Sequence, residues 1–271
     1  MLITDLDGTL ADKKGFIPAK NIEVLRRVGE LGIKRVIATG RSIFSANKIL
    51  DSDFPIDYLI FSSGAGILNW KTKEIILKNH IKDIYSHSII KILIDYKIDF
   101  MIHKEIPYNH KFCYVRHSNN NSDFERRVKL YEDHSTPFTN KNISNITQII
   151  AILPSANEIF NDIWALLNKN YSVKPVRATS PLDHKSVWLE IYPKHVSKAK
   201  AANWLLEKLN LNHTDTVAIG NDYNDIDLLD WSKKSYIVST APDELLTKYD
   251  VIDNSKSIGF YDMITKEYNQ G

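Results

Sequence analysis

Short apolar runs alternate with segments of helical periodicity in the first part of the chain. An apolar run at Leu2–Thr4 precedes a segment over residues 18–31 with apolar side chains at every third position, and a second apolar run follows at Val36–Ala38. This order predicts a strand, a helix and a second strand. Because a helix connects them, the two strands are expected to be parallel. Pro18 is typical of the first turn of such a helix, and Gly32 of its end.

The last part of the chain repeats this alternation and predicts a parallel sheet covered on both faces, the α/β class. The elements expected there are a strand at Val187–Ile191, a helix at Ser197–Leu209, a strand at Thr216–Ile219, a helix at Asp225–Trp231 and a strand at Ser235–Val238.

The middle of the chain has a different pattern. After a strand at Tyr58–Ser62 and a hairpin at Gly66–Leu77, strands are interrupted by only two helical patterns. The expected strands are Phe100–His103, Lys111–Val115, Gln148–Leu153 and Tyr171–Arg177, and the expected helices are Phe124–Tyr131 and Ala156–Leu167. We therefore predict a Rossmann-like parallel-sheet core domain over residues 1–79 and 185–271, with an α+β domain inserted at 80–184.

Composition excludes several classes of protein. The 271 residues are 43% hydrophobic and 25% charged, and 35 Lys and Arg against 33 Asp and Glu leave a net charge of +2, so no nucleic acid or membrane partner is expected. Cys113 is the single cysteine, which excludes an intramolecular disulfide and a cysteine-based zinc site. No signal peptide and no apolar window of membrane-spanning length is found, so we expect a cytoplasmic protein.

The first strand ends in a pair of carboxylates. In the run from Leu2 to Leu10, Asp5 and Asp7 are separated by one residue and followed by Gly8. Ligand-binding groups in open α/β sheets collect at the carboxyl ends of strands, where this pair would lie. An Asp-x-Asp pair also occurs in ordinary strand-to-turn sequences, so the pair by itself is weak evidence for a site.

With its surroundings, this pair resembles the first motif of the haloacid dehalogenase-like phosphohydrolases, and among them the Cof-type sugar phosphatases with a large α/β cap. Three further stretches resemble the later motifs of that family, in the family's order. The four stretches are Asp5–Leu10, Ile37–Arg41, Glu190–Pro193 with Val196–Lys198, and Gly220–Asp225. The interval between the second and third stretches is long enough for the large cap.

The resemblance implies a role for each matching residue. Asp5 would attack phosphorus and form an aspartyl-phosphate, and Asp7 would protonate the leaving alcohol and later deprotonate water. Thr39 would bind the transferring phosphoryl group, and Lys198 would offset its charge. Taken alone, Thr39 would more often be a helix N-cap and Lys198 a solvated residue.

The same resemblance implies Mg²⁺ held by Asp5, Asp7, Asn221 and Asp225, with Asp7 contributing its backbone carbonyl, Asn221 binding directly, and Asp225 acting from outside the inner sphere or through a water. The family usually has an Asp where this chain has Asn221, and a neutral amide oxygen should hold the cation less tightly than a carboxylate. Asp222 is the alternative ligand. A helix N-cap with acidic first-turn residues explains Asp222 and Asp225 equally well.

We expect the inserted domain to select the substrate by closing over its leaving group. The residues expected to bind substrate in the core are Gly8, Gly40, Arg41, Ser63, Gly64 and Asn224. Five basic residues of the inserted domain are more often surface or loop residues than substrate contacts, namely His103, Arg116, His117, Arg126 and Arg127.

The sequence thus predicts a Mg²⁺-dependent phosphomonoester hydrolase that acts on a small phosphorylated metabolite, such as a sugar phosphate. Two alternatives stay open. A phosphosugar mutase would pass the phosphoryl group to a sugar hydroxyl, and a non-catalytic phosphometabolite-binding protein would carry a metal site weakened by Asn221. Neither a Gly-x-Gly-x-x-Gly nor a Walker-type motif is present to support nucleotide binding.

Overall fold

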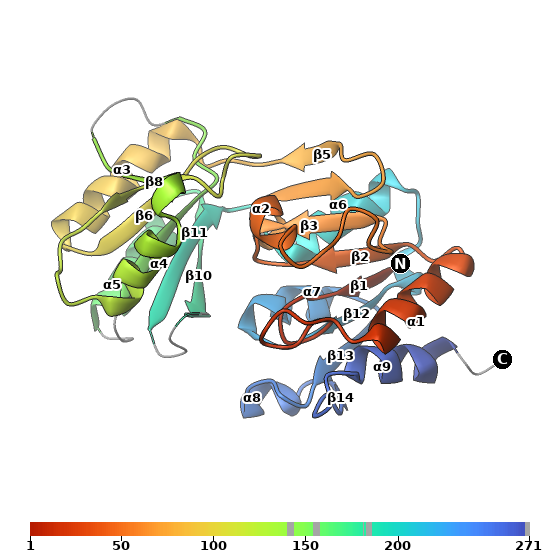
Figure 1. The fold of residues 1–271 in the computed structure, drawn as a ribbon. Helices are drawn as coiled ribbons and strands as arrows, with labels where there is room; N and C mark the ends of the chain where they lie inside the picture. The colour runs from red at the N-terminus through yellow and green to blue at the C-terminus, as the bar shows by residue number, and fades with distance from the viewer. Residues whose placement is uncertain (140–143, 154–157, 181, 183–185, 269–271) are drawn as a thin grey trace. The chain divides into compact units, whose positions relative to one another are not determined.

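The computed structural model describes residues 1–139, 144–153, 158–180, 182 and 186–268 (Figure 1). The chain forms two compact units. Unit 1 comprises Met1–Lys78 and Ser197–Gly271, and unit 2 comprises Asn79–Val196. None of the helices within the described residues combines the length and apolar character needed to cross a bilayer.

Unit 1 is built on an eight-stranded sheet with the strand order β14-β13-β12-β1-β2-β3-β4-β5. The strands are β1 (Leu2–Thr4), β2 (Arg35–Ala38), β3 (Tyr58–Phe61), β4 (Gly66–Asn69), β5 (Ile75–Lys78), β12 (Val217–Gly220), β13 (Lys234–Val238) and β14 (Asp250–Ile252). The six strands from β14 to β3 are parallel, and β4 and β5 continue the sheet as an antiparallel hairpin. The predicted parallel sheet and hairpin are confirmed.

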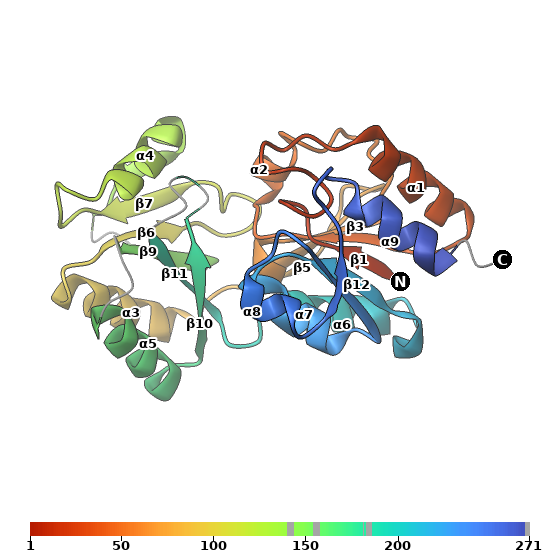
Figure 2. The ribbon, with the colours of Figure 1, turned by 90° about the horizontal axis from the view of Figure 1, so that it is seen from below.

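Helices cover both faces of this sheet (Figure 2). α1 and α9 lie on one face, and α6 and α7 on the other. The helices are α1 (Ala19–Glu30), α2 (Ile43–Ala46), α6 (Lys198–Lys208), α7 (Ile226–Trp231), α8 (Asp243–Leu246) and α9 (Gly259–Tyr268), with 3₁₀ turns at Ser62–Gly64, His213–Asp215 and Tyr223–Asp225. Ile3, Ala38 and Ala218 of the sheet pack with Ala202 and Leu205 of α6 in a fully buried cluster.

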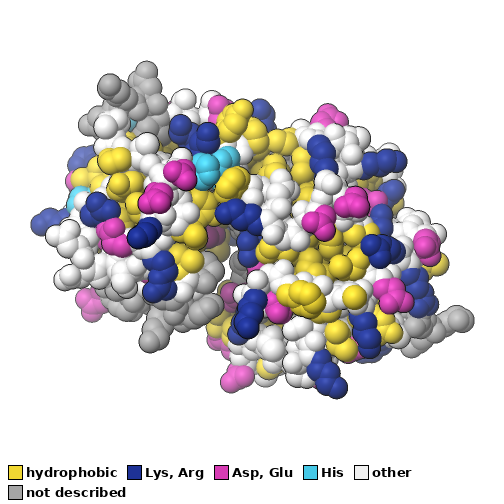
Figure 3. Space-filling model, in the orientation of Figure 1, with side chains coloured by type: hydrophobic (Ala, Val, Ile, Leu, Met, Phe, Trp, Pro, Cys, Tyr) yellow, Lys and Arg dark blue, Asp and Glu magenta, His cyan; other side chains and the backbone are white. Residues whose placement is uncertain are grey.

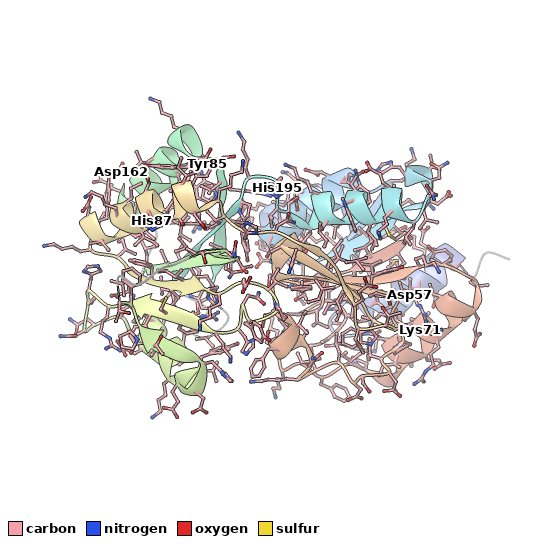
Figure 4. All side chains as sticks on the ribbon, turned by 90° about the horizontal axis from the view of Figure 1, so that it is seen from above. Asp57, Lys71, Tyr85, His87, Asp162 and His195 are labelled. Atoms are coloured by element: carbon pink, nitrogen blue, oxygen red, sulfur yellow. The ribbon has the colours of Figure 1, made fainter. Side chains whose placement is uncertain are left out.

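Local sequence explains the bounds of α1. Pro18 is the N-cap, Leu31 is the C-cap, and Gly32 follows with φ +75°. Proline suits the start because it has no N–H to leave unpaired, and glycine suits the end because it adopts the left-handed conformation at little cost. After the helix, Arg35 at the start of β2 donates from Nε and Nη2 to Asp57, which is labelled in Figure 4. This fork fixes β2 against the segment that leads into β3.

Unit 2 is an α+β fold on a six-stranded sheet with the order β10-β11-β9-β6-β7-β8. The strands are β6 (Asp99–His103), β7 (Phe112–Val115), β8 (Ser135–Pro137), β9 (Gln148–Leu153), β10 (Val173–Thr179) and β11 (Val187–Pro193). α3 (Asp83–Asp95) and α5 (Glu158–Asn170) pack on one face, and α4 (Ser122–Leu130) packs on the other, followed by a 3₁₀ turn at Glu132–His134. A ring nitrogen of His195 lies 2.9 Å from Asn79 Oδ1, which joins the two ends of the unit.

The prediction that Val187–Ile191 is a strand of the core sheet is wrong, because this strand lies in the sheet of unit 2. There, β11 pairs antiparallel with β9 and β10, and the chain returns to unit 1 at Ser197 rather than at 185. Its apolar side chains alternate between the two packed faces of that sheet, so the run resembles a strand buried in a parallel sheet. The expected domain boundary at 184/185 and the expected helix start at Ala156 lie outside the described residues.

Helix α3 was not predicted. Its Ile89, Ile90 and Leu93 are buried, but Ile92 and Ile94 are also apolar and Ile84 is exposed, so the helical periodicity is weak. The β-branched isoleucines also have a lower helix propensity than unbranched apolar residues. Packing against the sheet of unit 2 overrides this local preference.

Candidate active site

The candidate site lies at one edge of the unit 1 sheet, where four neighbouring parallel strands end. Asp5 directly follows β1, Thr39 follows β2, Ser62 follows β3 and Asn221 follows β12. The registers place β1 between β2 and β12, and β3 beside β2. Because parallel strands end at the same edge of a sheet, four stretches that are far apart in sequence meet there.

Asp5 is held at the centre of this edge. Its amide donates to the carbonyl of Ile219 in β12 at 2.9 Å, and the residue is 5% exposed. Asp5 Oδ1 accepts a hydrogen bond from Lys198 Nζ at 2.7 Å. Within the described part of the chain, Lys198 is the donor to this carboxylate, so Oδ2 remains available to another group.

Lys198 is the first residue of α6, and its side chain is fully buried. Ser197 caps the helix by accepting from the amide of Lys200. Lys198 Nζ also donates to Asp225 Oδ1 at 2.6 Å, so the ammonium group lies between two carboxylates. A buried ammonium needs such partners, and this lysine is therefore not the solvated residue that it would be by itself.

Asp225 uses both of its carboxylate oxygens. While Oδ1 accepts from Lys198, Oδ2 accepts from the amides of Asn221 at 3.0 Å and Asp222 at 3.2 Å. Asp222 and Asp225 also form a reciprocal capping box at the start of the turn Tyr223–Asp225. The helix-cap interpretation of this motif is therefore confirmed, and Asp225 in addition holds both Lys198 and the loop after β12.

The charges of this cluster shift its pKa values. Burial raises the pKa of Asp5 to about 7, the carboxylates of Asp225 and Asp7 add to the rise, and the ammonium of Lys198 opposes it. Burial lowers the pKa of Lys198, but the two carboxylates raise it more, so it lies above its ordinary value. Lys198 thus stays protonated, and when both carboxylates are ionised the cluster is one positive charge short of neutrality.

Thr39 and Ser63 line the neighbouring strand ends. Thr39 is 1% exposed, and its Oγ1 accepts from the amide of Arg41 at 3.1 Å. Thr39 is not the N-cap of α2, which is Ser42. Ser62 and Ser63 both have positive φ, 49° and 54°, and a Cβ added at Gly40 would lie 3.6 Å from Ser63 Oγ. Two buried non-glycine residues in the left-handed region are backbone strain of the kind found at binding sites.

Gly64 brings this strained turn against the start of α6. Its φ is +98°, and an added Cβ would lie 2.2 Å from the carbonyl oxygen of Ser197. Only glycine allows this approach, which brings Ser63 and Lys198 to the same edge of the sheet.

Asp7 is turned toward Arg41 rather than toward the lysine. Arg41 Nε lies 2.7 Å from Asp7 Oδ2 and Nη2 lies 2.7 Å from Asp7 Oδ1, a two-pronged ion pair. Arg41 was expected to contact substrate, but its guanidinium group contacts a second candidate catalytic residue.

Asn221 lies next to the first motif. A Cβ added at Gly8 would lie 2.6 Å from Asn221 Nδ2, and Gly8 has φ +82°. Among the described residues, no three His, Cys, Asp or Glu side chains converge as a metal-binding group. Of the expected ligands, Asp7 is paired with Arg41, Asp225 is paired with Lys198, and Asn221 is an amide, which is not one of these four residue types. Asn224 is half-buried in the turn beside them.

The basic residues of unit 2 mostly have structural partners. Arg116 donates from Nε and Nη2 to the two carboxylate oxygens of Glu125, and Arg126 Nη1 donates to the carbonyl of Leu182 at 2.8 Å. His103 Nδ1 donates to the carbonyl of Asn109 at 2.7 Å. Burial lowers the pKa of His103 to about 3, with smaller contributions from the charges of Arg127 and His110.

The backbone amide of His117 donates to Asp99, and the guanidinium group of Arg127 lies over the ring of Trp188 at 4.6 Å. These contacts account for both residues within unit 2.

Two buried asparagines support the first motif and were not predicted. Asn254 Nδ2 donates to the carbonyl of Gly8 at 3.0 Å, and Asn21 Nδ2 donates to the carbonyl of Leu10 at 2.9 Å. Buried amide side chains commonly satisfy loop carbonyls in this way. The sequence around these asparagines does not indicate this role. Asn254, for example, follows Gly8 by 246 residues.

The chain is similar in sequence and in fold to known phosphatases. The 5-amino-6-(5-phospho-D-ribitylamino)uracil phosphatase of Bacillus subtilis is 23% identical over 93% of this chain and 91% of its own length. A phosphatase of the haloalkanoate (HAD) superfamily from Bacteroides thetaiotaomicron has a TM-score of 0.81 at 19% identity, covering 99% of this chain and 94% of that one. A sugar phosphatase of HAD subclass IIB has a TM-score of 0.77 at 19% identity, and the match covers 99% of this chain and 98% of that one. The family model for haloacid dehalogenase-like hydrolases matches residues 2–264, and the chain therefore belongs to this family.

Proposed function

We propose that this chain is a phosphatase that hydrolyses phosphate monoesters of small metabolites, with Asp5 as the nucleophile and Asp7 as the general acid and base. The observation that carries the proposal is the buried carboxylate of Asp5, held at a sheet edge by Lys198 and with Oδ2 left available. Such a group suits covalent catalysis, because its position is fixed before substrate binds.

In the first step, a carboxylate oxygen of Asp5 forms a bond to phosphorus while the bond between phosphorus and the ester oxygen breaks. The Asp7 carboxyl gives its proton to the departing oxygen, so an alcohol leaves and an aspartyl-phosphate remains. In the second step, the Asp7 carboxylate takes a proton from water as the water attacks phosphorus. The bond from phosphorus to Asp5 breaks and inorganic phosphate is released. Asp5 is again a carboxylate, and Asp7 is again protonated.

Other residues at the same edge would hold the phosphoryl group. Lys198 carries a permanent positive charge beside Asp5, and the hydroxyl of Thr39 keeps its hydrogen for a phosphoryl oxygen while Oγ1 accepts from the amide of Arg41. The amide of Gly40 and the hydroxyl of Ser63 are further donors in the proposal, whereas the expected donor at Gly8 is already used, because its amide donates to the carbonyl of Ala11 at 2.8 Å. Donors fixed in advance stabilise the charge that develops on the phosphoryl oxygens.

The residues present fit a magnesium ion. With Asp5 and Asp225 both ionised, the buried Asp5–Lys198–Asp225 cluster carries one excess negative charge, and the amide side chain of Asn221 lies beside Gly8. The proposed ligands are the Asp5 carboxylate, the Asp7 backbone carbonyl and the side-chain oxygen of Asn221, because both oxygens of Asp225 are used by other donors. Bound there, the ion would neutralise charge on the phosphoryl group and on Asp5.

The substrate class in the proposal is a small phosphorylated sugar or polyol. Two similar proteins are named as phosphatases of such compounds, one acting on a phosphoribitylamino uracil and one a sugar phosphatase. The groups at the edge of unit 1 suit a phosphoryl group and would treat many esters alike, so we assign the choice among substrates to unit 2.

Release of inorganic phosphate tests the proposal. Sugar phosphates, polyol phosphates, nucleotides and p-nitrophenyl phosphate are incubated with the protein in Mg²⁺ and in chelator, with Asp5→Asn as the blank. Asp12→Asn is the matched control, because Asp12 is a carboxylate of the same segment that accepts from the amides of Lys14 and Phe16. Metal-dependent release that Asp5→Asn lacks and Asp12→Asn retains is the expected result.

The alternatives give different outcomes in the same assay. An isomerised phosphosugar without free phosphate would identify a mutase, and binding of phosphosugar without turnover at high Mg²⁺ would identify a binding protein. Full activity in Asp5→Asn would exclude the aspartyl-phosphate mechanism.

A further inference from the structure

Arg41 donates two hydrogen bonds from its guanidinium group to the carboxylate of Asp7. The Nε–Oδ2 and Nη2–Oδ1 distances are both 2.7 Å, the fork geometry in which guanidinium and carboxylate planes match. The third nitrogen, Nη1, lies 3.4 Å from the carbonyl oxygen of Ser45 in α2. The guanidinium group is therefore anchored on one side and holds a carboxylate on the other.

The backbone of Arg41 is fixed as well. Its amide donates to Thr39 Oγ1 at 3.1 Å, and its carbonyl accepts from the amide of Ser62 at 2.8 Å. One residue thus connects the segments that follow β1, β2 and β3. The backbone from which the guanidinium group extends is therefore held at the sheet edge.

Asp7 needs such a partner more than Asp5 does. The side chain of Asp7 is 43% exposed, whereas that of Asp5 is 7% exposed and held by Lys198. A carboxylate exposed to this degree samples several rotamers when nothing fixes it. Proton transfer requires its oxygen within hydrogen-bond reach of the departing oxygen, and a misplacement of about 1 Å costs roughly 10²-fold in rate.

We propose that Arg41 is a positioning residue, which fixes the carboxyl group of Asp7 for proton transfer instead of binding the phosphoryl group. This inference rests on the proposed function. A fork that already holds one carboxylate through Nε and Nη2 cannot present the same two nitrogens to a phosphate. Arg41 therefore acts on catalysis through Asp7, and only on the steps in which a proton moves.

Esters with different leaving groups separate this role from phosphate binding. An alkyl phosphate needs a proton on its departing oxygen, whereas p-nitrophenolate leaves without one. The value of kcat/KM reports the steps up to departure of the leaving group, and kcat includes hydrolysis of the aspartyl-phosphate. Both constants are measured on glycerol phosphate and on p-nitrophenyl phosphate for the wild type, Arg41→Gln and Arg41→Lys.

We expect Arg41→Gln to lower kcat/KM for the alkyl ester by about 10²-fold and for the aryl ester by less than fivefold. With the aryl ester, kcat falls and a burst of nitrophenolate equal to the enzyme concentration appears, because water attack is slowed. Arg41→Lys should resemble Arg41→Gln, since lysine keeps the charge but lacks the fork. In an Asp7→Asn background, Arg41→Gln should cause no further loss for the alkyl ester.

Arg35→Gln is the matched control, because Arg35 forms the same kind of fork with Asp57 at 3.0 and 3.1 Å, at the opposite end of β2. It should lower the thermal unfolding midpoint and change kcat/KM for both esters by the same small factor. Far-UV circular dichroism and the unfolding midpoint show that each variant is folded.

The outcomes are distinguishable. An equal loss of kcat/KM on both esters in Arg41→Gln, or full activity in Arg41→Lys, would assign Arg41 to charge stabilisation of the phosphoryl group and overturn the positioning role alone. Absence of phosphate release by the wild type from these two esters and from every other ester of the panel above would overturn the proposed function together with this role.

Discussion

Asp225→Asn tests the buried charge cluster most directly. Lys198 and Asp225 have side chains that are 0% exposed, and their Nζ–Oδ1 distance is 2.6 Å. Asparagine has nearly the same shape as aspartate, but only one of its two terminal atoms accepts hydrogen bonds. Either the ammonium of Lys198 or the amides of Asn221 and Asp222 must then face an NH₂ group.

The expected cost follows from these contacts. One charge-assisted hydrogen bond is lost, at about 1.5–3 kcal/mol, and one buried donor is left without an acceptor, at about 1–3 kcal/mol. Removing one partner of a buried ion pair costs about 3–5 kcal/mol by mutation. Because the repulsion between Asp5 and Asp225 is also relieved, we expect the lower end, about 3 kcal/mol of unfolding free energy.

Amide hydrogen exchange followed by mass spectrometry measures this loss within one unit. Peptides from β1 and β12 report opening of unit 1, and peptides from β6 and β9 report unit 2 as an internal control. Asp225→Asn should lower the protection of the first pair of strands and leave the second pair unchanged.

Asp222→Asn is the matched variant in the same loop. Asp222 accepts from the amide of Tyr223 at 2.7 Å, and asparagine caps a helix about as well as aspartate, so the expected loss is below about 1 kcal/mol. If the two variants lost the same free energy within about 1 kcal/mol, Asp225 would not be a buried ion-pair partner, and the argument would be wrong.

Three other outcomes are expected. Gly64→Ala should lose about 3 kcal/mol of unfolding free energy, because the added Cβ lies 2.2 Å from a carbonyl oxygen at φ +98°, whereas Gly32→Ala, at φ +75° with nothing within 4 Å, should lose about 1 kcal/mol. Urea unfolding measures both, and equal losses would contradict the close approach. Burial lowers the pKa of His103 to about 3, and the unfolded chain protonates near 6.5, so stability falls as the pH drops through the interval between these values. The loss from pH 7 to 5 should be about 2 kcal/mol and should be absent in His103→Gln, and parallel stability curves for the two proteins would refute this. Asn221→Asp should lower the Mg²⁺ concentration for half-maximal phosphate release, and an unchanged requirement would favour Asp222 as the ligand.

Much of unit 1 could be predicted because local signals and packing agree there. The strands around Leu2–Thr4 and Val36–Ala38 alternate with an amphipathic helix, and the two carboxylates after the first strand mark the edge where ligands bind. The neighbourhood of Asp5 and Lys198 was expected from the family resemblance, and their contact at 2.7 Å agrees with it.

Other features have no local signal. The run Val187–Pro193 is apolar on both faces, and its pattern does not tell an antiparallel neighbour from a parallel one. The sequence shows that Arg41 follows Thr39, but not that its guanidinium group meets Asp7 across the sheet edge. A long side chain such as that of Arg41 can reach several acceptors, and packing decides which of them it contacts. The hydrophobic periodicity of the sequence does not contain this information.

The position of β1 has a consequence for synthesis of the chain. β1 lies between β2 and β12, so Thr4 pairs with Ile37 soon after both are made, but its second partner, Ile219, follows 215 residues after it. At roughly 5–20 residues per second, this delay is about 10–40 s, during which the apolar edge of β1 has no neighbour on one side. Unit 2 is one continuous segment and is completed within this interval. On the ribosome, the inserted unit can therefore fold before the unit that carries the candidate active site, and the sheet around Asp5 closes last.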